Sequence, residues 1–550
     1  MNQTVRTKKI IGTVLIAVLA LVMLIPVFYT LQIGTSYFDA RLGVFGSPKV
    51  GMENVNTFKA SPEYHEVMSN TFEISALGAG IGVVYVFLLS MAIGSVKDRF
   101  FKAILAVLFA IPTVIPVRVF YSIFPGEVLL SSPELMKQCV AVMDGLRLAG
   151  LFSLVALFIR GDVLKESGKC VLIFIAVKLA LVLTMDMTTM FQVDNSGYGD
   201  VQSLVRLAYN RGMRGGEYSH VAATDMIRLG YQLLAGIVGC LILMLIYGEF
   251  KKSNQNCLRT DVQCVSNTPK GLKLFTVATI IPILILIFAI TNGASLIPDV
   301  RDPKFEAGFQ LEWKMALESA LWVSVISFLF AMAARNAFKG VGFIILMLLL
   351  ATGNNLIGNY VLAHDLGMLD TVKGMAFYNL QMIPVISLLM TCATYKDRNW
   401  KKDIVVFLGG FVLMFGYFWG DFAGSLIMNV KPELHTLSYH LLGLTRLELT
   451  SASAIPYIPN STLLYIIIPV AAVAVGMLGC AFLNYNKKKP IPAAFEQTPS
   501  FDSQQPLYPN QQPVYAGQPT VMPQQVGVSP QEDIVEPKPE PVENSTTPLQ

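Results

Sequence analysis

The chain has 550 residues, of which 53% are hydrophobic and 14% are charged, and its mean hydropathy is +0.55. Because soluble proteins carry about 25% charged residues, this composition excludes an ordinary soluble domain and predicts a polytopic membrane protein. The net charge of +4 comes without a basic stripe, which argues against nucleic acid as a partner and leaves membrane lipid as the expected surroundings.

The first apolar segment, 10–31, follows a basic N-terminus. A signal peptide is the alternative interpretation. The apolar run is too long for a typical signal core, however, and no small-residue cleavage site follows it. We therefore expect an uncleaved transmembrane helix.

Apolar runs of about 20 residues recur along the chain, and such runs cross the hydrocarbon as helices. They lack the alternation of barrel strands, so the predicted fold class is all-α with about twelve transmembrane helices. The predicted spans are 10–31, 71–95, 102–124, 138–159, 169–191, 225–248, 272–292, 315–335, 340–362, 374–395, 404–427 and 462–484.

Basic residues gather on every second connection, which predicts that these connections and both termini are cytoplasmic. The expected location is a bacterial plasma membrane, crossed many times. The basic connections are VKDRFFK (96–102), RGDVLKESGK (160–169), 249–273, RNAFKG (335–340), YKDRNWKKD (395–403) and NKKKP (486–490). The segment 486–550 is rich in Pro and Gln and is expected to be a disordered cytoplasmic tail. A docking site for a Pro-reading module is the alternative for this tail.

Two stretches of the chain look alike. ALGAGIGVVYVFLLSMAIGSVKDRFFKAILAVLFA begins at Ala76, and ALESALWVSVISFLFAMAARNAFKGVGFIILMLLLA begins at Ala316. Each predicts a helix, a short basic turn and a second helix, at the same place in a set of six. We therefore predict two parallel six-helix repeats, 1–250 and 272–485, joined by a cytoplasmic linker, 251–271. Chance similarity between apolar helices is the alternative.

These residues carry a family resemblance. SMAIGSVKDRFFKAIL and IPTVIP (111–116) in the first half, and AMAARNAFKGVGFIIL and FGYFWGDFAGSLIMNVKPELHTLSYHL (415–441) in the second, resemble the membrane permease subunits of carbohydrate-uptake ABC importers, with two subunits fused in one chain. The resemblance implies transport by alternating access. It also implies two partners, a separate cytoplasmic ABC ATPase and an extracellular solute-binding protein.

The chain departs from this family at the connections that couple to the ATPase. Such permeases carry a long cytoplasmic loop with Glu-Ala-Ala, which forms a docking helix. The matching connections here, RGDVLKESGK and YKDRNWKKD, are short and lack that motif. Either coupling differs, or the permease fold serves here as a scaffold that no longer transports.

Charges inside a membrane span are costly and indicate function. Asp144 and Arg147 lie three residues apart, so they share a helix face and can pair with each other. Lys178 has no acid within one turn, which predicts a partner on another helix, with Asp144 as a candidate; Asp186 lies near the same face. For both groups the alternatives are a structural ion pair and a solute path.

Polar residues also interrupt the later spans. Asn355 and Asn359 predict either hydrogen bonds between helices or the lining of a polar cavity, which Gln381 could share. Trp419 and Asp421 stand in an apolar run, and the resemblance implies that they face the solute. An interfacial Trp with a solvated acid is the alternative.

Catalysis finds no support in the sequence. The five His and seven Cys show no metal-binding spacing, and no phosphate loop, nucleophile elbow or dinucleotide fingerprint is present. We therefore expect no enzyme activity, no cofactor and no metal in this chain. The favoured interpretation is an ABC importer permease for a sugar or similar small solute. A non-transporting membrane scaffold and an ion-coupled secondary transporter are the alternatives.

Overall fold

The computed structural model describes residues 3–96, 98–121, 132–159, 163–193, 201–257, 282–285, 287, 303–338, 340–394, 400–442 and 459–483. Every regular element within these residues is a helix, apart from an isolated β-bridge between Ser36 and Lys49, which confirms the all-α class. The chain divides into two compact units, 1–486 and 487–550. The predicted tail and most of the predicted linker lie outside the described residues.

Six helical segments are long and apolar enough to cross a membrane, or seven with one bent pair, in the part of the chain that the structure describes. These helices are those of a multi-pass membrane protein, whereas the count of twelve spans stays a prediction. The six segments are Arg6–Gly34, Glu63–Ser95, Pro133–Ala156, Tyr218–Gly248, Glu306–Asn336 and Val372–Thr394.

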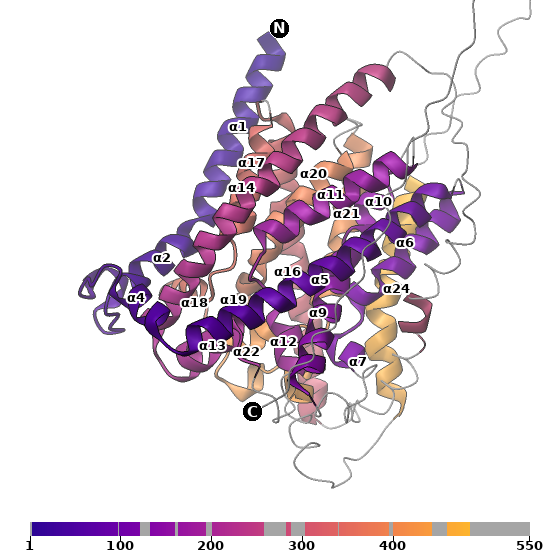
Figure 1. Ribbon diagram of the computed structural model, residues 1–550. Helices are drawn as coiled ribbons and strands as arrows, with labels where there is room; N and C mark the ends of the chain where they lie inside the picture. Colours follow the sequence, from indigo (N-terminus) through magenta and orange to yellow (C-terminus); the bar gives the residue numbers. More distant parts are fainter. Residues whose placement is uncertain are drawn as a thin grey trace, which may run out of the picture. The chain divides into compact units, whose positions relative to one another are not determined.

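The first half of the chain, up to residue 257, supplies the helices drawn from indigo to magenta (Figure 1). They are α1 (Gln3–Met23), α2 (Ile25–Gly34), α3 (Gly43–Gly46), α4 (Glu53–Ala60), α5 (Glu63–Ser95), α6 (Arg99–Val114), α7 (Val117–Tyr121), α9 (Pro133–Gly150), α10 (Ser153–Ala156), α11 (Val163–Ala180), α12 (Met187–Val193), α13 (Leu204–Leu207), a π-helical turn (Ala208–Arg214) and α14 (Tyr218–Cys257).

The second half supplies a similar series. Its helices are α16 (Pro303–Asn336), α17 (Val341–Thr352), α18 (Leu356–Asp365), α19 (Val372–Tyr378), a 3₁₀ turn (Asn379–Met382), α20 (Ile383–Thr394), α21 (Trp400–Phe418), α22 (Ala423–Met428), a 3₁₀ turn (Pro432–Leu434) and α24 (Pro459–Leu483). Of the predicted span 272–292, only residues 282–285 and 287 are described.

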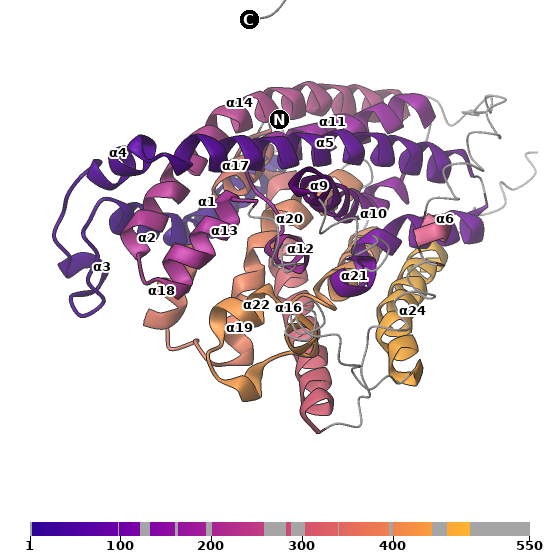
Figure 2. The same ribbon diagram turned by 60° about the horizontal axis from the view of Figure 1, so that its bottom comes forward.

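Long helices of the first half lie side by side. Helix α11 packs between α5 and α14, and Figure 2 shows these three helices running together. Helix α9 packs against α5 and α6. In the second half α16 packs against α19, α20 and α21, and α21 also packs against α24. Contacts between the halves join α1 to α16, α14 to α17 and α6 to α24.

Several predicted spans are broken helices, which corrects the prediction that they are continuous. The span 169–191 divides into α11 and α12 around Leu183, whose φ is 64°. The span 404–427 divides into α21 and α22 around Gly420, whose φ is 86°. A positive φ is incompatible with a right-handed helix, so each helix must stop there.

Two further spans change direction. Helices α17 and α18 are bent by 89° at residues 353–355. Helices α6 and α7 are separated by Ile115 and Pro116, where the proline removes a backbone donor and disfavours a helical conformation at the preceding residue. Broken helices place unpaired backbone groups inside the bundle, and such backbone is tolerated only where protein or a cavity satisfies it.

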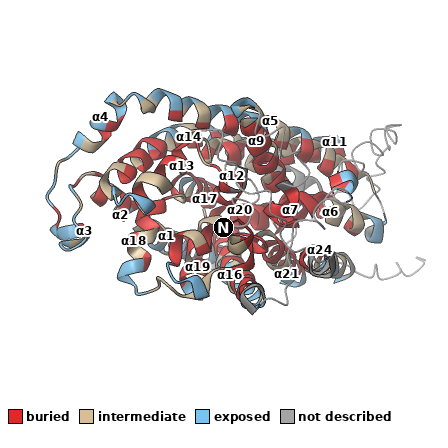
Figure 3. Ribbon diagram, turned by 90° about the horizontal axis from the view of Figure 1, so that it is seen from below, coloured by how far each residue is buried: buried red, intermediate tan, exposed pale blue. Residues whose placement is uncertain are grey.

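Burial divides the helices into an inner and an outer part (Figure 3). Side chains around α9, α20 and α21 are mostly buried, while exposed apolar side chains lie on the outer helices. On α1 and α14, Leu21 is 67% exposed and Leu245 is 75% exposed. Apolar side chains in this position are compatible with contact to lipid. The charged residues Asp144, Arg147 and Lys178 are among the buried ones.

Candidate functional site

A cavity of about 100 Å³ lies where residues of both halves meet, next to the break between α11 and α12. Its polar and charged lining residues come from the first half (Asp144, Arg147, Lys178, Thr184, Asp186, Arg228) and from the second half (Asn354, Tyr378, Gln381, Tyr417). The structure therefore brings together five of the residues that the sequence singled out: Asp144, Arg147, Lys178, Asp186 and Gln381.

Lys178 on α11 pairs with Asp144 on α9. The Lys178 Nζ lies 2.6 Å from Asp144 Oδ2, and both residues are buried. The prediction that Lys178 pairs with an acid on another helix is confirmed, and its partner is the expected one. A buried pair of this kind is sensitive to the loss of either partner, because the remaining charge would be left unpaired in a low-dielectric interior.

Arg147 pairs with Asp186 and not with Asp144, its neighbour on the same helix face. Arg147 Nε lies 3.5 Å from Asp186 Oδ2, while Asp144 is bonded to Lys178. The guanidinium also lies over the Tyr417 ring, 4.9 Å from its centroid, and donates to the Ile115 carbonyl at 3.4 Å. The predicted Asp144–Arg147 pair is wrong because the tertiary fold offers each charge a partner on another segment.

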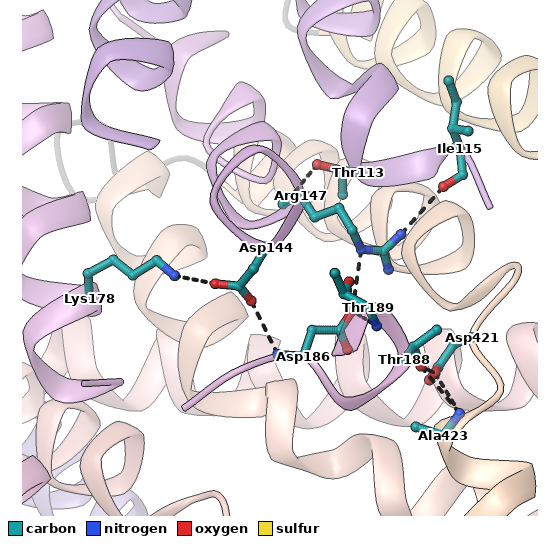
Figure 4. A network of polar contacts seen from close by, with 10 residues as sticks. All are labelled: Thr113, Ile115, Asp144, Arg147, Lys178, Asp186, Thr188, Thr189, Asp421 and Ala423. Atoms are coloured by element: carbon teal, nitrogen blue, oxygen red, sulfur yellow. Dashed lines mark hydrogen bonds and ion pairs between the residues drawn. The ribbon is translucent and has the colours of Figure 1, made fainter. Parts of the chain in front are cut away.

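Asp186 also holds the break in place. Its Oδ2 accepts hydrogen bonds from the Thr189 hydroxyl at 2.6 Å and the Thr189 N–H at 3.3 Å, so it caps the first turn of α12. The Asp186 N–H in turn donates to Asp144 Oδ1 at 3.2 Å. The carboxylates that pair with Lys178 and Arg147 thus also accept hydrogen bonds from backbone groups at the break (Figure 4).

Asp421 lies at the corresponding break in the second half. It is buried, and its Oδ1 accepts from the Ala423 N–H at 3.0 Å, at the start of α22. The same oxygen accepts from the hydroxyl of Thr188, which belongs to α12 in the first half. This bond links the two halves directly, beside Asp186 and Thr189 (Figure 4).

The remaining predicted site residues lie outside the cavity lining. Asn355 begins α18, and its side chain donates to the Thr352 carbonyl across the bend, while the adjacent Asn354 lines the cavity. Asn359 is buried one turn further along α18. Asp421 reaches the network through Thr188 and is not itself a lining residue.

Trp419 is fully buried in an aromatic cluster. Its ring lies 5.7 Å, centroid to centroid, from both Phe309 and Trp313, and its Nε1 donates to the Tyr465 carbonyl at 3.0 Å. This environment is one of packing between α16, α21 and α24. Trp419 therefore stabilises the break from one side, while Asp421 faces Thr188 on the other.

Two functional candidates, Arg228 and Glu312, were not predicted from the sequence. Arg228 on α14 lines the cavity and pairs with Asp225 at 2.9 Å, three residues earlier; the Asp-Arg spacing at the start of the predicted span 225–248 was the available signal. Glu312 was expected in a loop, but α16 begins at Pro303, which places Glu312 inside the helix and fully buried.

Glu312 binds the backbone at the break between α21 and α22 through Gly420. Its carboxylate accepts hydrogen bonds from the Gly420 N–H at 2.8 Å, the Ser438 N–H at 2.8 Å, the Ser438 hydroxyl at 2.6 Å and the Tyr465 hydroxyl at 2.7 Å. Hydrogen bonds to a buried carboxylate are stronger than those between neutral groups. One side chain thus joins α16, the break, the helical stretch 437–442 and α24.

This arrangement can hold a small polar group in the cavity between the halves. Among the described residues, no group of three or more His, Cys, Asp or Glu is placed to hold a metal ion. The cavity instead offers guanidinium, ammonium, amide and phenol groups together with two carboxylates. No protein-family model matches the chain, and neither curated proteins nor solved structures contain a significant match.

Proposed function

We propose that the chain is a permease-like subunit of an ABC importer, which moves a sugar or similar small solute across the cytoplasmic membrane by alternating access. The observation that carries the proposal is the polar cavity between the halves, lined by charged residues of the first half and polar residues of the second. Transporters built from repeats place their substrate site at the repeat interface, next to discontinuous helices.

The packing of the helices supports two equivalent repeats. In the first half α5 contacts α9 and α11, and in the second half α16 contacts α20 and α21. Helices α11 and α14 contact each other as α21 and α24 do. Between the halves, α6 contacts α24 as α17 contacts α14. The helices that correspond in predicted order thus have corresponding neighbours.

The details of the breaks support the same correspondence. Asp186 directly precedes α12, and Asp421 lies two residues before α22. The second predicted helix of each half then anchors the start of a helical stretch that follows the break: Thr71 Oγ1 accepts from the Leu204 N–H at 3.0 Å, and Glu312 accepts from the Ser438 N–H at 2.8 Å. Such agreement is expected of a repeat and is not expected of unrelated apolar helices.

The cavity is small for a solute site. Its volume is about 100 Å³, whereas ligand pockets usually measure about 300–1,000 Å³. A solute larger than this must enter by separation of the two halves. The Thr188–Asp421 contact across them is a place where such separation would break a hydrogen bond.

The proposed partners are a separate cytoplasmic ABC ATPase and an extracellular solute-binding protein. The connections that would reach the ATPase are short, because α10 ends at Ala156 and α11 begins at Val163, while α20 ends at Thr394 and α21 begins at Trp400. Neither interval has room for a docking helix of several turns with its flanks. Coupling through these connections would therefore use a smaller surface than the family resemblance implies.

A non-transporting scaffold is the second candidate, and the charges near these connections favour it. Arg335 and Asp403 form a buried bidentate ion pair of 2.6 and 2.9 Å, and Lys102 donates to the Ile159 carbonyl at 2.9 Å. Charges used inside the bundle are not available to hold an ATPase. A scaffold would keep the fold without the rocking motion.

The two candidates differ in partners and in motion. We expect tagged protein from the native host to copurify with an ABC ATPase, and deletion of the gene to reduce uptake of labelled small solutes. If no ABC ATPase copurifies and deletion of the gene leaves uptake unchanged, the importer is rejected. Uptake that persists without any ATPase would instead indicate ion coupling.

Motion is tested by joining the halves. In a chain whose seven Cys are replaced, Thr188→Cys with Asp421→Cys is treated with a reducible cross-linker. Alternating access predicts that cross-linking stops uptake and that reduction restores it. The control pair is Asn70→Cys with Gln202→Cys, because Asn70 Nδ2 donates to the Gln202 carbonyl within the first half. Uptake that survives the Thr188–Asp421 cross-link would contradict the mechanism.

A further inference from the structure

We propose that the central cavity binds a carboxylate, so that the solute is a small carboxylic acid anion and not a neutral sugar. The inference rests on the proposed function, because it names the solute class for the same cavity. It is carried by two buried arginines, Arg147 and Arg228, which line the cavity with unused donors.

The donors of the cavity exceed their partners. Arg228 is 6% exposed; its guanidinium pairs with Asp225, and within the described residues its Nε has no hydrogen-bond partner. Arg147 is 2% exposed; its Nε is likewise without a hydrogen bond and lies 3.5 Å from Asp186. Buried polar groups are normally satisfied, and a guanidinium has five N–H donors to satisfy.

Three of the four carboxylate oxygens that line the cavity are already engaged. Asp144 accepts from Lys178 Nζ on one oxygen and from the Asp186 N–H on the other. Asp186 accepts from both the hydroxyl and the N–H of Thr189 on Oδ2, which leaves its Oδ1 as the carboxylate oxygen of the lining that accepts no hydrogen bond from the described residues. The partnerless Oδ2 of Asp225 belongs to a residue that does not line the cavity. The hydroxyl protons of a neutral sugar would therefore find few free carboxylate oxygens here.

The ligand that completes this site must bring acceptors and little else. A carboxylate matches the planar fork of a guanidinium, and arginine is the side chain that binds it in bidentate fashion. The lining carries three cations, Arg147, Lys178 and Arg228, and two acids, Asp144 and Asp186, while the acidic partner of Arg228, Asp225, lies outside the lining. A cavity of about 100 Å³ admits a carboxylate with a short carbon chain in this conformation.

Binding can be measured on the purified full chain without any partner protein. Acetate and lactate are compared with acetamide and lactamide, which have the same shape without the charge, at ionic strength held constant with NaCl. We expect the acids to raise the melting temperature in a saturable manner and the amides to have no effect, since a ligand that binds the folded state stabilises it.

Variants assign the effect to the cavity. Arg228→Gln is expected to weaken lactate binding by about tenfold or more, because a hydrogen-bonded charge is lost. Arg228→Lys keeps the charge but loses the planar fork of the guanidinium, so its affinity for lactate should lie between those of Arg228→Gln and the native protein. The double variant Asp225→Asn with Arg228→Gln removes both buried charges and covers the case in which the single variant does not fold.

The control is Arg211→Gln, whose ion pair with Glu63 is partly exposed and outside the cavity. Equal stabilisation by amides and acids, no stabilisation by either acid, or binding that survives both Arg228 variants would overturn the inference. These results are independent of uptake. Carboxylate binding without any transport would reject the proposed function alone, whereas uptake of a neutral sugar without carboxylate binding would reject this inference alone.

Discussion

Lys178 and Asp144 form a buried ion pair of 2.6 Å between α11 and α9, and both residues line the cavity between the two halves. The two residues are 34 positions apart in the chain, and Lys178 lies near the C-terminal end of α11. It also determines the pairing of the next charges, because Asp144 is no longer available to Arg147. The stability of this region therefore depends on both members of the pair.

Removal of Lys178 alone should destabilise the protein strongly. Lys178→Met leaves Asp144 as an unpaired buried charge, and we expect a loss of about 3–5 kcal/mol in the free energy of unfolding. The double variant Lys178→Met with Asp144→Leu removes both charges and should recover most of that loss. Thermal unfolding in detergent measures both effects.

The control for this prediction is Lys137→Met. Lys137 pairs with Glu73 and Glu134, whose side chains are 48% and 60% exposed, so the loss should be below about 1 kcal/mol. A double variant as unstable as Lys178→Met itself would show that the charge pair does not account for the effect.

Gly420 should tolerate no side chain. Its φ is 86°, and a Cβ placed on it would lie 2.6 Å from the Cβ of Pro116. We expect Gly420→Ala to cost about 1–3 kcal/mol, since it combines backbone strain with a clash. Gly80→Ala is the matched control, because a Cβ at Gly80 in α5 meets nothing within 4 Å and should add up to about 1 kcal/mol of helix stability. Equal melting temperatures for the two variants would contradict the assignment of Gly420.

Glu312 should hold the helical stretch 437–442 that follows α22. Glu312→Gln replaces one carboxylate oxygen by a donor that faces other donors, and we expect a loss of about 1.5–3 kcal/mol per affected bond. Hydrogen exchange at residues 435–442 should become faster, because the Ser438 N–H loses its partner.

The same helix supplies the control for Glu312. Glu318→Gln alters an exposed contact with Trp322 Nε1 at 3.4 Å and should leave exchange at 435–442 unchanged. Unchanged exchange in Glu312→Gln as well would mean that residues 435–442 are held by other contacts.

The orientation of the chain is tested at the two ends of its first span, Arg6–Gly34. Basic residues at the N-terminal end predict that this end is cytoplasmic. In a chain without native Cys, Phe45→Cys should react with an impermeant thiol reagent in intact cells, since Phe45 is 70% exposed. Lys8→Cys should react only after permeabilisation. The reverse pattern would place the termini outside.

The positions of the helices followed from the sequence because an apolar run of sufficient length has few alternatives in a membrane. Each described helix of α5, α14 and α16 covers its predicted span and extends beyond it, as at Glu312. The breaks did not follow. Average hydropathy is unchanged by a single residue with positive φ, so the runs around Leu183 and Gly420 read as continuous helices.

Composition and pattern by themselves determined that this chain is helical and apolar and that it carries rare charges within its spans, because each of these is a local property of the residues. Tertiary structure alone decided the partner of each charge. Lys178 pairs with Asp144, and Arg147 pairs with Asp186, because helix packing brings distant segments within bonding range. The spacing along one helix indicated only that Asp144 and Arg147 could pair with each other. The same packing enclosed Arg228 and Glu312, since burial depends on neighbours that a sequence pattern does not name.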